Sequence, residues 1–333
     1  MAIERLSPLD QRLLGDFQHR LPLVARPFST LAEELGLDEA AVLARLRVLV
    51  EQGAVSRVGA VCRPHVVGAS TLAAVAAPEW QIDAVAAAIA AEPGINHLYL
   101  REHALNLWFV ATGPDADHVA GTLASIARTT GLEVVDLPLV RAYHIDLGFA
   151  LDPAARRHDR PRAGAPRAAV ALSAADRDLV QALVDGLPLV PTPFAVLGCA
   201  LGLDEKAVLA RIAALDAAGV FARLGIIVRH RAVGWRANAM VTFRPPVDAI
   251  DRMGEALAAN PAITLCYRRR PDPIRWPFPL FCMVHGRTRD ATLDDLARAV
   301  HAAGMTRVER RILFSLRCYK QTGALVSHRR SAA

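Results

Sequence analysis

The chain has 333 residues, 53% of them hydrophobic, and a formal net charge of +6. Its length exceeds the usual size of one hydrophobic core, so two or more domains are expected. No apolar run approaches the roughly 20 residues of a membrane span, and charges stand where a signal peptide would be apolar. Together with five cysteines that form no CxxC pair, these features argue against a membrane or secreted disulfide-built protein and predict free thiols in the cytoplasm.

The first 66 residues are expected to form three short helices followed by a strand. Ser7 is typical of a capped helix start, and the sequence TLAE at 30–33 resembles a capping box. Gly36 suits a helix end, and Asp38 suits the start of a third helix. Followed by the strand sequence VSRVGAVC at 55–62, these helices predict a winged helix-turn-helix.

The next part of the chain has the order strand, helix, strand, strand, helix, strand. The expected segments are Ser70 to Ala77, Ile82 to Glu92, His97 to Arg101, Asn106 to Thr112, Ala116 to Thr129 and Glu133 to His144. This order is that of a ferredoxin-like βαββαβ unit.

The sequence repeats itself at an offset of 166 residues, as in LGLDEAAVLARL against LGLDEKAVLARI. This match predicts a duplication. The second ferredoxin-like unit is expected at Ala237 to Arg244, Val247 to Ala259, Thr264 to Arg269, Leu280 to His285, Leu293 to Ala303 and Arg307 to Arg317. The predicted fold class is α+β, with two tandem copies of a winged helix-turn-helix plus a ferredoxin-like domain. The predicted domains are 1–66 and 171–232 (winged helix-turn-helix), 67–150 and 233–323 (ferredoxin-like), a linker at 151–170 and a tail at 324–333.

A winged helix followed by a ferredoxin-like domain resembles the Lrp/AsnC regulators, which implies DNA binding as one candidate function. Both predicted recognition helices, however, begin with an Asp-Glu pair, at 38–39 and 204–205, where phosphates and bases would be contacted. Acids at helix starts are also ordinary caps, so this alternative stays open at the level of sequence. The remaining polar candidates for DNA contact are Arg45, Arg47, Lys206 and Arg211.

The segment CYRRRPDPIRWPFPLFCMVHG at 266–286 places four arginines, a tryptophan and four prolines between two apolar strands. Together with REHALNLWFV at 101–110 and RAYHIDLGF at 141–149, it resembles the siroheme decarboxylases, which are Lrp/AsnC-like proteins that have turned catalytic. Those enzymes usually consist of two related subunits, and this chain resembles a fusion of the pair, as occurs in heme d1 biosynthesis. The resemblance runs from about residue 6 to about residue 323.

The resemblance implies loss of carbon dioxide from the C12 and C18 acetates of siroheme, which gives 12,18-didecarboxysiroheme for heme d1 or heme. It implies no added cofactor and no metal site, since iron enters as part of the substrate. The eight carboxylates of siroheme require a broad apolar slot and several guanidinium groups. The expected partner is therefore siroheme, with no nucleic acid or membrane, and with the two halves paired within one chain. A homo-oligomer is left open.

Loss of carbon dioxide leaves electron density on a methylene carbon, so a proton donor is needed, and histidine suits this role near neutral pH. The catalytic candidates are His103, His144 and His285, each at or near a predicted strand end. The candidates for substrate binding are Arg101, Arg141, Tyr143, Tyr267, Arg268, Arg269, Arg275, Trp276, Arg317 and Lys320. At the tip of the loop, Arg275 and Trp276 are expected to close over the macrocycle, with the indole stacked on the ring.

Other interpretations of the same residues remain open. A run of arginines is also typical of a solvated loop, and a histidine at a strand end is often an ordinary hydrogen-bonded residue. A non-catalytic tetrapyrrole sensor or carrier would share the arginine loop without needing a proton donor. Because the short REHAL turn at 101–105 corresponds to the long loop in the second half, the halves cannot have equivalent sites; one shared pocket and two different pockets both fit.

Overall fold

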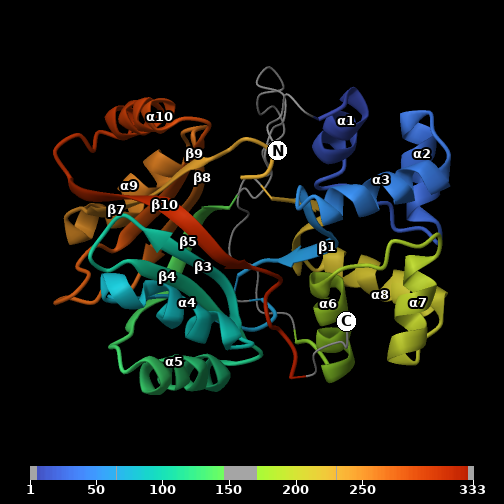
Figure 1. The fold of residues 1–333 in the computed structure, drawn as a ribbon, viewed down its shortest axis with the longest axis horizontal. Coiled ribbons are helices and arrows are strands. Elements are labelled where there is room, and N and C mark those ends of the chain that lie inside the picture. Colours follow the sequence, from blue (N-terminus) through green and yellow to red (C-terminus); the bar gives the residue numbers. More distant parts are fainter. Residues whose placement is uncertain (1–5, 65, 146–170, 230, 329–333) are drawn as a thin grey trace.

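The computed structural model describes residues 6–64, 66–145, 171–229 and 231–328. They form two units, one of short helices and one built around a strand barrel (Figure 1). The predicted linker at 151–170 lies outside the described residues. Within the described part of the chain, no helix is long and apolar enough to cross a membrane.

The two halves have the same order of elements. The first half contains α1 (Pro8–Asp16), α2 (Pro27–Leu35), α3 (Glu39–Glu51), β1 (Val55–Cys62), β2 (Ala69–Val75), α4 (Ile82–Ala91), β3 (Ile95–Arg101), β4 (Leu107–Gly113), α5 (Ala116–Thr130) and β5 (Val135–Ile145). The second contains α6 (Ala174–Asp185), α7 (Pro193–Leu201), α8 (Glu205–Ala217), β6 (Phe221–Val228), β7 (Ala237–Arg244), α9 (Ile250–Ala258), β8 (Ile263–Arg269), β9 (Leu280–Gly286), α10 (Arg289–Ala302) and β10 (Glu309–Gln321). Short 3₁₀ helices, Glu79–Gln81 and Val247–Ala249, precede α4 and α9.

Local capping explains where most of the short helices begin. Ser7 and Asp10 form a reciprocal capping box at the start of α1, and Asp38 accepts a backbone hydrogen bond at the start of α3. Gly36 ends α2 in the left-handed conformation, as expected, with φ of 70°. The capping box expected at 30–33 is wrong, because α2 already begins at Pro27, whose fixed φ suits a first helical position.

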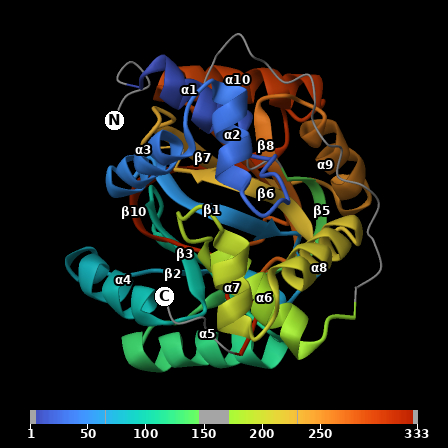
Figure 2. The ribbon, with the colours of Figure 1, turned by 90° about the vertical axis from the view of Figure 1, so that its right-hand side faces the viewer.

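The predicted wing strands do not remain in separate domains. Instead β1 pairs antiparallel with β6 of the other half, with Gly59 opposite Gly225. A Cβ atom at Gly59 would overlap the carbonyl group of Leu183 in α6, so glycine is required for the helix to lie this close. The resulting β1–β6 ribbon lies between the helices and the barrel (Figures 1 and 2).

The strands of both ferredoxin-like units join in one closed barrel, in the order β10-β3-β4-β2-β5-β8-β9-β7. Closure depends on the two last strands, each of which pairs with both halves. Residues 135–138 of β5 pair with β2, and residues 139–145 pair with β8. Likewise, residues 309–314 of β10 pair with β7 and residues 315–321 with β3. The two expected sheets are thus one structure, held together by strands that cross between halves.

Strand alternation gives the barrel an outer and an inner apolar layer. On β4, Phe109 and Ala111 belong to the outer core under α4 and α5, whereas Trp108 packs inside the barrel. Helices α9 and α10 cover the equivalent outer face of the second half. An inner cluster, called here the aromatic plug, fills part of the barrel interior and consists of Leu72, Ala74, Trp108, Val135, Leu137, Met240, Trp276, Phe278, Phe281 and Leu313.

The segment after β10, which the sequence assigns to a tail from 324 onward, is packed against both units up to residue 328. The backbone N–H of Leu325 donates to Thr112 Oγ1 of β4 at 2.9 Å. The N–H of Val326 donates to Gln181 Oε1 of α6 at 2.7 Å. Both Leu325 and Val326 are buried, so this segment ties the barrel to the helices.

Candidate active site

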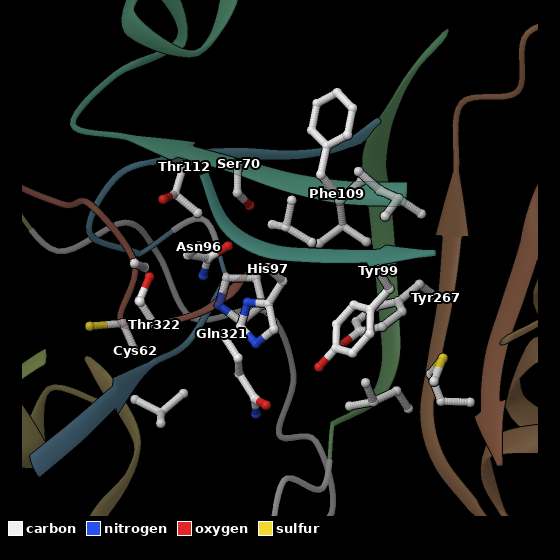
Figure 3. A pocket seen from close by; sticks show the side chains of 18 of the residues that line it. Cys62, Ser70, Asn96, His97, Tyr99, Phe109, Thr112, Tyr267, Gln321 and Thr322 are labelled. Atoms are coloured by element: carbon white, nitrogen blue, oxygen red, sulfur yellow. The ribbon is translucent and has the colours of Figure 1, made fainter. Parts of the chain in front are cut away.

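A cavity of about 390 Å³ lies between the aromatic plug and the β1–β6 ribbon. Its volume falls within the range of small-molecule sites. Both halves contribute to it, through inner-face residues of the barrel strands, through the ribbon and through the segment at 322–326. Figure 3 shows part of its lining, which includes His97 and Tyr99 of the first half and Tyr267 and Gln321 of the second. This cavity is therefore shared by the two halves of the chain.

Arg101 is buried at one side of this cavity and is held by the other half of the chain. Its Nη1 donates to the carbonyl of Leu313 at 3.2 Å and to Ser315 Oγ at 2.9 Å, both on β10. Its guanidinium group lies 5.5 Å from the ring centre of Tyr99, two residues earlier on the same face of β3. Arg101 is thus fixed in place without a carboxylate partner.

Arg269 occupies the equivalent position on β8 and has equivalent contacts. Its Nη1 donates to the carbonyl of Leu137 on β5 at 3.0 Å, and its guanidinium group lies 5.3 Å from the ring centre of Tyr267. Burial lowers the pKa of both Arg101 and Arg269 to about 10, so both remain cationic at neutral pH. The cavity therefore has two matching Tyr-Arg pairs, one from each half.

The β1–β6 ribbon adds further cations on the opposite wall. Arg57 of β1 and Arg223 of β6 stand at equivalent places in the repeat, and Arg63 follows β1; all three line the cavity. Burial lowers the pKa of Arg57. The Nε atoms of Arg57, Arg101 and Arg269 have no hydrogen-bond partner among the described residues, and no described Asp or Glu lines the cavity. Such a cluster of desolvated cations is arranged to receive an anionic ligand.

Among the described residues, two histidines line this cavity. His97 lies on β3 beside Gln321 of β10, with which it is paired in register (Figure 3). Burial, and then the positive charge of Arg57, lower the His97 pKa to about 4, so its imidazole is neutral in the free protein at pH 7. His285 lies at the end of β9 with Nδ1 2.8 Å from Thr264 Oγ1. Each half therefore contributes a described imidazole to the cavity lining.

The structure brings four of the sequence-predicted site residues together at the cavity: Arg101, Tyr267, Arg269 and His285. The loop tip lies elsewhere. Trp276 is 1% exposed and belongs to the aromatic plug, with its ring centre 4.8 Å from that of Trp108 and 5.1 Å from that of His103. Neither Trp276 nor His103 lines the cavity. The expected indole lid is not seen, because burial against other aromatic rings stabilises Trp276 more than an exposed position would.

Other predicted residues lie outside the cavity lining and have partners within the protein. Arg275 forms ion pairs with Glu133 and Asp272, and His144 is buried on β5 opposite Cys266. As substrate-binding or catalytic residues, these two are not supported by their placement.

A second set of predicted residues joins the halves on the outer side of the barrel. Arg141, Tyr143 and Arg268 all contact Asp251 of α9. In the mirror arrangement, Arg317 contacts Asp83 of α4 at 2.9 Å. Lys320 donates to the carbonyls of Ala90 and Glu92 at 2.7 and 3.0 Å. These side chains already have acceptors, so their placement supports a structural role.

Sequence reasoning missed Arg57, Arg223, His97 and Tyr99. A signal for the last two was present, since His97, Tyr99 and Arg101 alternate along one strand and therefore share a face. Arg57 and Arg223 are also the same residue type at equivalent places in two strands that hold no other charged residue. Nothing in the sequence indicated that these strands pair and cover the barrel, so their arginines could not be assigned to the site.

The helices that would read DNA offer few free cations. Arg45 of α3 is bound to Asp10 of α1, with Nη2 2.6 Å from Oδ2, and Arg211 of α8 is bound to Asp176 of α6 in the same way. Arg47 donates to the carbonyl of Leu189. The exposed residues of α8 include the alanines Ala210, Ala213, Ala214 and Ala217. This surface lacks the basic stripe of a duplex-binding face.

Comparison with known proteins agrees with this arrangement. A model of the siroheme decarboxylase NirDL-like HTH domain matches residues 10–55 and 176–221, and a model of the AsnC-like ligand binding domain matches 67–144 and 232–320. The siroheme decarboxylase NirDL subunit of Paracoccus pantotrophus is 50% identical over 323 residues, which is 97% of this chain and 98% of that protein. The chain belongs to the siroheme decarboxylase NirDL family. The NirD subunit of Stutzerimonas stutzeri, 51% identical over 149 residues, covers 44% of this chain and 98% of its own length, so a separate relative corresponds to one half of this NirDL-type chain.

Solved structures of the family show the same fold. The crystal structure of the siroheme decarboxylase NirDL matches with a TM-score of 0.66 at 24% identity, covering 97% of this chain and 95% of that one. A structure of NirDL in complex with an iron-uroporphyrin III analogue matches with a TM-score of 0.65 at 25% identity, covering 93% and 92%. The arrangement of helix-turn-helix and AsnC-like ligand-binding domains in this chain is therefore that of the family.

Proposed function

We propose that this chain removes the carboxyl groups of the C12 and C18 acetates of siroheme and releases 12,18-didecarboxysiroheme, an intermediate on the way to heme d1. In each step the bond between the methylene carbon and the carboxylate carbon breaks, carbon dioxide leaves, and the methylene carbon gains one proton to become a methyl group. The names of the full-length relatives and the iron-uroporphyrin analogue bound in a related structure support siroheme as the substrate.

The observation that carries the proposal is the acid-free, arginine-lined cavity. Arg57, Arg63, Arg101, Arg223 and Arg269 line it, and siroheme has eight carboxylates around a flat ring. Arginine forks pair well with carboxylates, and these pairs are strong where water is excluded. Apolar and aromatic residues on the remaining walls, such as Trp108 and Met240, suit the macrocycle itself.

The arginines bind the substrate, whereas the acetates that lose carbon dioxide require a different environment. A guanidinium group on a leaving acetate would stabilise the ground state more than the transition state, whereas one on a propionate orients the substrate at no such cost. We therefore assign the arginine pairs to the carboxylates that do not react. The reacting acetates belong in the apolar parts of the cavity, where charge that spreads into the ring is favoured over charge on a carboxylate.

Of the histidines in the described ranges, His285 and His97 line the cavity and are in reach of a ligand there. We assign the proton donor to His285, which is hydrogen-bonded and lies at a strand end of the second half. His97 is neutral in the free protein at pH 7, so it suits a hydrogen bond to the substrate. His103 and His144 have no place at the cavity in this assignment.

Anaerobic incubation of the purified protein with siroheme, followed by mass spectrometry of the tetrapyrrole, tests the proposal. Loss of two carboxyl groups is expected in buffer without any added cofactor, because the reaction needs no oxidant or reductant and the macrocycle itself takes up the electron density of the breaking bond. Binding of siroheme without a change in mass would instead indicate a tetrapyrrole carrier. An Arg101→Gln, Arg269→Gln double variant tests the role of the arginine pairs. Both siroheme binding and turnover should fall in it.

A further inference from the structure

The Thr264 side chain of β8 lies directly behind the imidazole of His285. Its Oγ1 is 2.8 Å from His285 Nδ1 and 3.1 Å from the carbonyl oxygen of Met283 on the neighbouring strand. Both Thr264 and His285 are buried, each with 9% of its surface exposed. Of this pair, His285 lines the cavity and Thr264 does not, so Thr264 can act on a ligand only through the histidine.

These two contacts together favour one arrangement of the protons. A threonine hydroxyl has one proton to donate and lone pairs to accept. The Met283 carbonyl can only accept, so the arrangement that satisfies both contacts at once has the hydroxyl proton on that carbonyl and the oxygen accepting from His285 Nδ1–H. With Nδ1 holding a proton in both the neutral and the charged imidazole, proton exchange is confined to Nε2.

The first half does not have this pair. By the alignment of β3 with β8 and of β4 with β9, Asn96 takes the place of Thr264 and Thr112 takes the place of His285. Thr112 Oγ1 instead donates to the carbonyl of Gly94 at 3.0 Å and accepts the backbone N–H of Leu325 at 2.9 Å. The equivalent place in the first half is thus occupied by a structural contact to the chain's C-terminal segment.

We infer that Thr264 is a positioning residue for the decarboxylation: its hydroxyl fixes the ring orientation and the Nδ1–H tautomer of His285, so that Nε2 is the nitrogen that delivers the proton. Because the first half lacks the Thr264–His285 hydrogen bond, the proton is delivered at the end of the cavity that the second half forms. This inference rests on the proposed function, since it assumes that His285 is the donor.

Three variants test it. Thr264→Val keeps the shape and removes the hydroxyl, and should lower kcat about 10- to 100-fold, the range typical when the partner that orients a metal-binding imidazole is removed. The KM and the siroheme Kd should change little, because Thr264 does not touch the ligand. Thr264→Ser, which restores the hydroxyl, should recover most of the rate. Thr292→Val is the matched control, because Thr292 is a buried threonine with two hydroxyl hydrogen bonds outside the cavity.

Nitrogen-15 NMR of histidine-labelled protein gives a readout that needs no turnover. The His285 signal, identified by its loss in His285→Gln, should show the Nδ1–H tautomer in the wild type and in Thr264→Ser, and a mixture in Thr264→Val. An Nε2–H tautomer in the wild type would overturn the inference even if Thr264→Val failed to fold, and so would a normal kcat in Thr264→Val. A wild type that binds siroheme with the expected tautomer but releases no carbon dioxide would instead reject the proposed function.

Discussion

Arg101 and Arg269 enter the same cavity from opposite halves of the chain, and each is held by a carbonyl of the other half. Arg101 donates to Leu313 of the second half, and Arg269 donates to Leu137 of the first. The strands that carry these carbonyls, β10 and β5, are those that close the barrel. The duplication therefore produces a shared site with approximate two-fold repetition of its cationic groups, and barrel closure and ligand recognition depend on the same contacts.

The arginine pairs should dominate substrate affinity. Arg101→Gln or Arg269→Gln removes a charge-assisted hydrogen bond to a carboxylate, which is worth about 1.5–3 kcal/mol, so the siroheme Kd should rise about 10- to 100-fold for each. Absorbance titration with siroheme measures this. The control is Arg298→Gln, which removes an exposed arginine paired with Asp295 on α10 and should leave the Kd unchanged. If all three variants bound siroheme with equal affinity, the substrate would not bind through these cavity arginines.

The sequence predicts most of the local structure, because the signals are local. Ser7 and Asp38 mark helix starts by their own hydrogen bonds, and period-two alternation identifies the strands. Two features depend on contacts between residues far apart in sequence: the crossing of β5 and β10 between the halves, and the pairing of β1 with β6. A prediction made for each repeat alone therefore gives two separate sheets and two separate wings.

The same distinction applies to the site. Arg101, Arg269 and His285 lie at strand ends, and their positions follow from the predicted sheet. Arg275 and Trp276 stand out by composition, yet composition does not tell an exposed loop tip from a buried one. In the folded chain, the carboxylates of Glu133 and Asp272 pair with Arg275, and the aromatic plug encloses Trp276.

The neutral state of His97 predicts a pH dependence of stability. Its pKa is lowered from 6.5 to about 4 in the folded chain, so between these values the unfolded chain binds more protons. The stability that depends on neutral His97 should therefore be fully present above pH 6.5 and be lost as the pH falls toward 4, by on the order of 3 kcal/mol. In His97→Leu, which copies the leucine found at 265, this part of the decline should disappear. Urea unfolding at pH 7 and pH 5 measures the difference; an unchanged pH slope would mean that water or a neighbour stabilises the charged imidazole.

The buried carboxylate of Asp176 should stabilise the helical unit. The hydrogen bond from Arg211 is the main cause that lowers the Asp176 pKa from 3.8 to about 2, against an opposing effect of burial. A depressed carboxyl pKa contributes stability above the unfolded value, and this contribution is lost as the pH falls from about 4 to 2. Asp176→Asn should reduce the free energy of unfolding by about 1–3 kcal/mol at pH 7, as measured by thermal unfolding. The exposed Asp216→Asn on α8 is the control, and it should have almost no effect.

Replacing Trp276 distinguishes between two roles for its side chain, as part of the aromatic plug or as a lid over the substrate. In the plug, the indole packs against Trp108 and Phe278 and is 1% exposed, so Trp276→Ala leaves a cavity in the barrel and should cost about 3–5 kcal/mol of unfolding free energy. Trp276→Phe, which keeps an aromatic ring, should recover part of that loss. In both variants, siroheme affinity measured below the unfolding transition should stay close to that of the wild type, because Trp276 does not line the cavity. A lid would give the opposite pattern, in which Trp276→Ala retains stability and loses affinity, since an exposed indole contributes little to folding but would cover much of the bound ring.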